Sequence, residues 1–89
     1  MVDWEACFRA VEACCDRLGI EIRRERLGGA GGGMCAMRGR RMMFVDLDAD
    51  LATRTERCLA ELAGLPELDG VYVPPVLREA LDRHRNTVK

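Results

Sequence analysis

The glycine-rich run from 28 to 33, Gly-Gly-Ala-Gly-Gly-Gly, is the feature that most restricts how this chain can fold. Glycine offers no side chain to pack and frees the backbone, so we expect this run to be a loop outside any regular element. The 89 residues are 48% hydrophobic and 33% charged, a balance typical of folded globular proteins. We therefore predict that residues 1–89 form one small domain with this loop inside it.

An amphipathic helix is predicted before the loop, from about residue 3 to residue 18. Asp3 can cap its first turn, and Gly19 supplies the left-handed residue that commonly ends a helix. The apolar positions recur at steps of four and three, at Trp4, Phe8, Val11, Cys15 and Leu18. Because Phe8 lies on the centre of this stripe, we expect it to anchor the core.

Three strands are predicted next. Residues Ile20 to Leu27 carry charged groups at most positions other than Ile20 and Ile22, which suits the edge of a sheet. After the glycine run, Met34 to Arg38 and Arg41 to Leu47 are expected to form an antiparallel hairpin around a tight turn at Gly39 and Arg40.

Two helices are predicted to complete the chain. The first begins after Asp48 or Asp50, either of which can cap it, and ends at Gly64. A turn at 69–70 and a brief extended piece at 71–73 lead to a last helix that begins at the proline pair 74–75. The apolar sides of these helices are predicted at Leu51, Thr55, Cys58, Leu59 and Leu62, and at Val76, Leu77, Ala80, Leu81 and His84.

The predicted fold class is α+β. We expect a three-stranded antiparallel sheet with an N-terminal helix and two C-terminal helices, in the order α-β-β-β-α-α.

Charge and cysteine usage exclude several classes of partner and location. The net charge is −1, with 14 basic and 15 acidic residues that alternate along the chain, so no nucleic-acid partner is expected. No apolar run is long enough to span a membrane, and the first residues lack the pattern of a signal peptide, so we predict no membrane association and a cytoplasmic location. The five cysteines are odd in number and lie mostly among apolar residues, so we predict reduced thiols and no intramolecular disulfide.

The segment Phe44-Val45-Asp46-Leu47-Asp48 resembles the nucleophile motif of haloacid-dehalogenase-type phosphatases, in which the first Asp attacks phosphorus and the second acts as acid and base. Here Ala49-Asp50 replaces the family's Gly-Thr, and fewer than 40 residues follow, too few for the rest of that site. We instead expect Asp46 to be exposed and Asp48 and Asp50 to cap the following helix. A calcium loop is also excluded, because Leu51 and Arg57 stand where Gly and Glu are needed.

A small-ligand or soft-metal site is the alternative function that the residues suggest. Backbone N–H groups of the glycine run could approach a ligand, although Met34 and Cys35 follow where a phosphate-binding Walker loop needs Lys and Ser or Thr. Met34, Cys35 and Met37 could supply sulfur ligands, although the chain has no CxxC spacing. A nucleophilic pair of Cys35 with His84 would need two separate elements to meet. We predict no cofactor, no metal and no catalytic residue.

The element order over residues 20–64 resembles the core of ImmA/IrrE-type bacterial metallopeptidases, in which a hairpin leads into the zinc helix. The segment Gly32-Gly33-Met34-Cys35 is also similar to that of small bacterial proteins with a Gly-Gly-x-Cys hairpin. Where the peptidases carry His-Glu-x-x-His, this chain has Thr55-Glu56-Arg57-Cys58-Leu59, so no zinc ligand carries over. The resemblance implies a shared scaffold without the chemistry.

The function expected from the sequence is that of a non-catalytic interaction or structural domain. In the strand from 41 to 47, alternation places Met43, Val45 and Leu47 on one side and Met42, Phe44 and Asp46 on the other. Short helices with one apolar stripe each are not expected to cover both sides. We therefore predict an interface at Met42 and Phe44 that binds a protein partner or a second copy as a homodimer.

Overall fold

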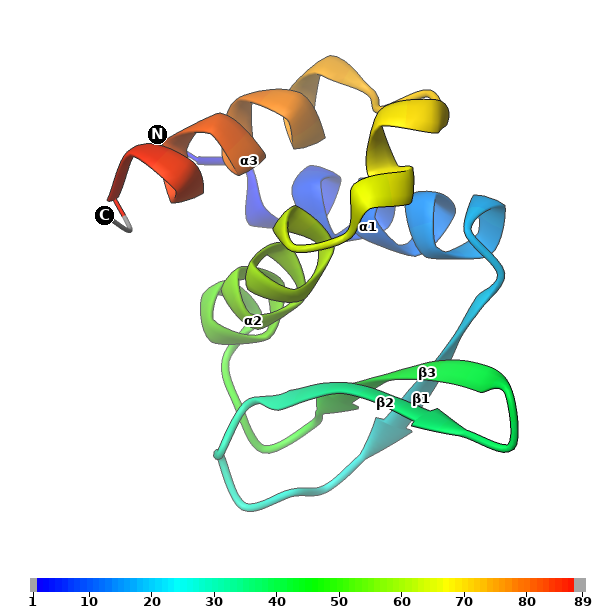
Figure 1. Ribbon diagram of the computed structural model, residues 1–89. Helices are drawn as coiled ribbons and strands as arrows, with labels where there is room; N and C mark the ends of the chain where they lie inside the picture. Colours follow the sequence, from blue (N-terminus) through cyan, green and yellow to red (C-terminus); the bar gives the residue numbers. More distant parts are fainter. Residues whose placement is uncertain (1, 88–89) are drawn as a thin grey trace.

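A computed structural model describes residues 2–87 (Figure 1). The elements are α1 (Trp4–Arg17), β1 (Ile20–Glu25), β2 (Gly32–Met37), β3 (Arg40–Asp46), α2 (Leu51–Ala63), the 3-10 helix η1 (Pro66–Gly70) and α3 (Pro75–Thr87). The predicted α+β class and the order α-β-β-β-α-α are confirmed; η1 replaces the turn expected at 69–70. No helix within residues 2–87 is long and apolar enough to cross a membrane.

The sheet is mixed, and the expectation of a fully antiparallel sheet is wrong. Its strand order is β1-β3-β2, in which β2 pairs antiparallel with β3 whereas β1 pairs parallel with β3. The glycine-rich loop makes this order feasible, because it carries the chain from β1 past the end of β3 to the far edge. The apolar β3 is therefore central and the charged β1 lies at an edge, as its sequence predicted.

Glycine determines both ends of β2. The hairpin turn is at Arg38 and Gly39, with φ of 52° and 78°, one residue earlier than predicted, because a two-residue type I′ turn requires positive φ at both positions. At the other end, Gly32 and Gly33 belong to the strand, so the prediction that they are loop residues is wrong. A Cβ atom on Gly32 would overlap the carbonyl oxygen of Phe44, so only glycine allows β2 to approach β3 there.

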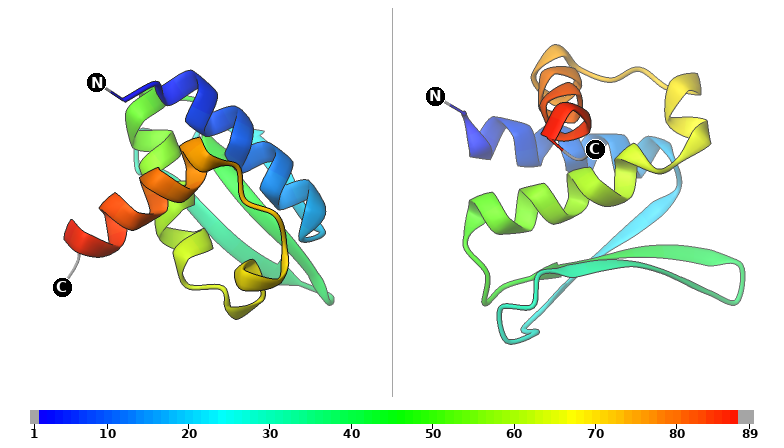
Figure 2. Two further views of the ribbon diagram at one scale, coloured as in Figure 1. Left: turned by 90° about the horizontal axis from the view of Figure 1, so that it is seen from above. Right: turned by 60° about the vertical axis from the view of Figure 1, so that its left-hand side comes forward.

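All three α-helices lie on one side of the sheet (Figures 1 and 2). Helix α1 contacts β1, helix α2 contacts β2 and β3, and α3 packs on α1 and α2. The result is a sheet, a middle layer of two helices and an outer third helix. Among the described residues, no helix covers the opposite side of the sheet, which we call the open face (Figure 2).

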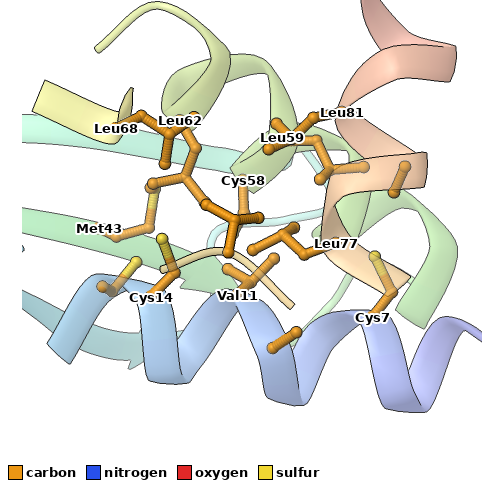
Figure 3. Packing of buried hydrophobic residues seen from close by; sticks show 14 of the residues in the cluster. Cys7, Val11, Cys14, Met43, Cys58, Leu59, Leu62, Leu68, Leu77 and Leu81 are labelled. Atoms are coloured by element: carbon orange, nitrogen blue, oxygen red, sulfur yellow. The ribbon is translucent and has the colours of Figure 1, made fainter. Parts of the chain in front are cut away.

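The core fills the space between β3 and the helices (Figure 3). Met43 and Val45 are buried there, with Val11 from α1 and Leu62 from α2. Helix α2 buries four of its five predicted apolar positions, and Leu51 is half-buried. The buried residues of α1 are Cys7, Ala10, Val11, Cys14 and Cys15.

Phe8 is only half-buried at the periphery of this core, so its prediction as a core anchor is wrong. The small side chains of Cys7 and Cys14 face the core instead. Their size allows α1 to pack closely against the other helices, which leaves no room for a phenyl ring at the centre.

Candidate interaction surface

Asp46, the last residue of β3, holds the glycine-rich loop in place. Its Oδ1 accepts the backbone N–H groups of Leu27 at 2.9 Å and Asp48 at 2.8 Å. Its Oδ2 accepts the N–H of Gly31 at 3.0 Å. The side chain is 0% exposed, so the prediction of an exposed Asp46 is wrong. The cause is the loop itself, which crosses the end of β3 and encloses the carboxylate.

The environment of Asp46 keeps its carboxylate charged. Burial would raise the pKa, but backbone hydrogen bonds from Gly31, Leu27, Asp48 and Gly29 outweigh it and lower the pKa to about 2. Both oxygens are already used to hold the backbone. Asp46 is therefore a structural anchor in this geometry, and its ionised carboxylate has no proton to donate near neutral pH.

The loop's own backbone donors are largely occupied. Besides the N–H groups of Leu27 and Gly31 on Asp46, the N–H of Gly28 donates to Oδ2 of Asp48 at 3.0 Å. Asp48 also forms an ion pair with Arg26 at 2.9 Å. A phosphate group would have to displace these carboxylates from the donors that it needs. Asp50 alone caps α2, through the N–H of Thr53 at 2.8 Å, so the alternative of Asp48 as cap is wrong.

The sulfur atoms considered as metal ligands are not brought together. Met34 lies on the helix side of the sheet and packs against the core, whereas Cys35 and Met37 alternate with it and belong to the open face. His84 lies elsewhere, beside a hollow of about 280 Å³ between the helices. Within residues 2–87, no group of three or more His, Cys, Asp or Glu side chains could hold a metal ion.

Met42 and Phe44 project from the central strand onto the open face, opposite the buried Met43 and Val45. Both are half-buried. In the register of the hairpin, Met42 is beside Cys35 and Phe44 is beside Gly33. Met37, which is 53% exposed, continues this apolar stripe toward the turn.

Both edges of the sheet are protected against the addition of a strand. At the β2 edge, the carboxylate of Glu61 on α2 accepts the backbone N–H of Met34. Beside it, Arg57 donates to the carbonyl oxygen of Ala30 at 3.1 Å. At the β1 edge, Arg24 forms an ion pair with Glu12 of α1. Because charged side chains guard both edges, the open face is the sheet surface that remains for contact.

Charged residues of β1 border the apolar stripe, and the sequence analysis did not identify them as part of the surface. Glu21 forms ion pairs with Arg23 at 3.4 Å and with Arg40 at 3.1 Å. The alternation of Glu21, Arg23 and Glu25 was the available signal, because residues two apart share one side of a strand. Glu61 carried no local signal, since its role depends on how α2 lies over β2.

Comparison of the chain with protein-family models, with curated protein sequences and with solved structures gave no match.

Proposed function

We propose that this protein is a non-catalytic interaction domain whose binding surface is the open face around Met42 and Phe44. The observation that carries the proposal is the two-sided apolar character of β3. Met43 and Val45 fill the core on one side, while Met42 and Phe44 are only half-buried on the other. A soluble domain that leaves large apolar side chains on an uncovered sheet face gains stability when another surface covers them.

The other candidate chemistry finds less support in the geometry. Asp46 and Asp48 hold the loop, and the sulfur atoms of Met34 and Cys35 belong to opposite sides of the sheet. The interleaved acidic and basic residues of β1 suit a protein surface better than a polyanion such as nucleic acid. Five free thiols suit the reducing cytoplasm, which is where we place the domain.

Photo-crosslinking from within the face tests the proposal. A benzophenone amino acid replaces Met42, and a second protein carries it in place of Ala60, an exposed residue of α2. After irradiation of the cells that produce the protein, adducts are identified by mass spectrometry. We expect adducts from position 42 that disappear when Phe44→Glu is added, and fewer adducts from position 60.

The proposed interaction surface is contradicted if position 42 gives no more adducts than position 60. It is also contradicted if Phe44→Glu leaves the adducts unchanged while circular dichroism shows an intact fold.

A further inference from the structure

One end of the open face carries a basic hollow with an apolar floor. The hollow has a volume of about 370 Å³ and lies beside the hairpin turn. Met37 and Met42 provide its apolar surface. Three arginines and one glutamate provide its charged lining, at positions Glu21, Arg23, Arg38 and Arg40. The excess of positive charge favours an acidic partner with a bulky apolar group.

The other end of the same face has the opposite character. Because β1 and β3 are parallel, their carboxyl ends lie together, and the N–H of Leu47 donates to the carbonyl oxygen of Glu25 at 2.8 Å. Leu27, which follows β1, is 39% exposed at this end. Glu25 shares the open-face side of β1 with Arg23 and lies beside the buried carboxylate of Asp46 in the strand register, whereas the Asp48 carboxylate is paired with Arg26. This end therefore has an excess of negative charge, whereas the hollow at the other end has an excess of positive charge.

A face with complementary ends can pair with a copy of itself. Stacked sheets pack either with their strands aligned within about 30° or nearly at right angles, and only the aligned arrangement lets the ends of two copies of this face meet. A two-fold axis along the strands would bring the two basic hairpin ends together, which is repulsive. A two-fold axis across the strands places each basic end on the acidic end of the other copy.

This second arrangement also matches residues at the centre. The strand register places Glu21 beside Met42 and Arg23 beside Phe44. With the axis between these two rows, Met42 meets Phe44 of the second copy and Glu21 meets Arg23 of the second copy. Gly33, beside Phe44, adds no side chain that would obstruct the approach.

We infer that the occupant of the open face is a second copy of this chain, packed face to face with its strands antiparallel around a two-fold axis. The inference rests on the proposed function and adds the identity and orientation of the partner. It predicts a dimer with a two-sheet core between two outer layers of helices.

Charge reversal tests the orientation. Sedimentation equilibrium at micromolar concentration should show a wild-type dimer. Glu21→Arg alone or Arg23→Glu alone should raise the Kd of the dimer by at least about tenfold. Each substitution places like charges at position 21 of one copy and position 23 of the other, and the two-fold axis repeats this contact. An equimolar mixture of the two variants should dimerise again, since one copy then contributes two carboxylates and the other two guanidinium groups.

A matched pair of variants on α1 controls for net charge. Glu5 and Arg9 are exposed on α1, and Glu5→Arg and Arg9→Glu change the net charge equally. Neither should weaken the dimer. A mixture of the β1 variants that stays monomeric, or α1 variants that behave like them, would overturn the antiparallel arrangement.

A monomeric wild type would overturn the inference as a whole. The proposed function is then judged separately by crosslinking from position 42. An adduct with a different protein would retain the interaction surface and exclude the second copy, whereas the lack of a specific adduct would exclude both.

Discussion

Gly31 donates its backbone N–H to the buried Oδ2 of Asp46 at 3.0 Å, which joins the glycine-rich loop to the end of β3. The two partners are fifteen positions apart in the sequence. Asp46 also receives the N–H of Leu27, where β1 has just ended. One carboxylate therefore fixes the path by which the chain passes from one edge of the sheet to the other.

Asp46→Asn should lower stability and change its dependence on pH. The pKa of Asp46 is about 2 in the folded protein, against an ordinary value of 3.8. Because the folded pKa is the lower one, the ionised carboxylate stabilises the fold above about pH 4, and this contribution is lost as pH falls toward 2. Urea unfolding between pH 2 and 7 should show a less stable variant at pH 7 and a narrowing difference at low pH. Asp48→Asn, the control, loses the ion pair with Arg26 but keeps the Asp46 carboxylate, so it should still lose stability as pH falls toward 2. Profiles of Asp46→Asn and wild type that have the same shape would contradict the anchor.

Thiol reactivity should distinguish Cys35 from the other four cysteines. Cys7, Cys14, Cys15 and Cys58 are buried and Cys35 is exposed. Burial raises the pKa of Cys15 and of Cys58 to about 12, so these thiols lack the reactive thiolate. A thiol reagent at pH 7 should modify one cysteine in the folded protein and all five in urea. Rapid modification of more than one thiol before unfolding would contradict the packing of α1 on α2, and an unreduced mass two units below the free-thiol form would reveal a disulfide.

The sequence was sufficient to predict the three α-helices and the three strands, although not η1 or the start of β2, because most of their signals are local. Capping by Asp3, apolar periodicity and Pro75 indicated where helices begin and how they face. The strand order was not predictable in this way, since pairing of β1 with β3 depends on the path of the loop. The same holds for Asp46, whose burial follows from a loop that begins about twenty residues earlier in the chain.

The candidate surface was predictable only in part. Alternation along one strand was enough to place Met42 and Phe44 on the same side. That Glu21 and Arg23 lie beside these residues could be recognised only from the parallel register of β1 with β3. The burial of Phe8 was predicted wrongly from periodicity. An apolar stripe identifies the side of a helix that faces the core, but it does not say which residues on that side become fully buried.

The loss of stability on truncating a side chain should depend on how deeply the side chain is buried and not on its size. Leu62 of α2 is fully buried in the core, so Leu62→Ala should cost roughly 2–5 kcal/mol in the free energy of unfolding. Phe8 is half-buried, and Phe8→Ala should therefore cost less than Leu62→Ala, although it removes more atoms. Urea denaturation of both variants measures the difference. The reverse order would show that Phe8 packs at the centre of the core.

Glu61→Ala should expose the β2 edge. The variant leaves the backbone N–H of Met34 without its acceptor. It also removes the carboxylate that α2 places beside β2, an edge strand with no charged side chain of its own. Unprotected edges pair with other chains, so we expect concentration-dependent aggregation detected by light scattering. Glu56→Ala removes an equal charge from an exposed position on the same helix and should leave the protein soluble. Equal behaviour of the two variants would contradict a guarding role for Glu61.

Arg38→Asn should stabilise the hairpin. Arg38 is the non-glycine residue with positive φ among residues 2–87, at 52°, where its Cβ crowds the backbone. Asparagine tolerates this conformation, and Asn-Gly is strongly preferred in type I′ turns, so the free energy of unfolding should rise by about 1 kcal/mol. Because Arg38 also lines the basic hollow, the comparison is made in a Phe44→Glu background that cannot use the open face. Arg40→Asn provides the matched control on the adjoining strand: it removes the ion pair with Glu21 without relieving a positive φ, so it should give no gain. An Arg38→Asn protein no more stable than this control would show that the turn carries no strain to relieve.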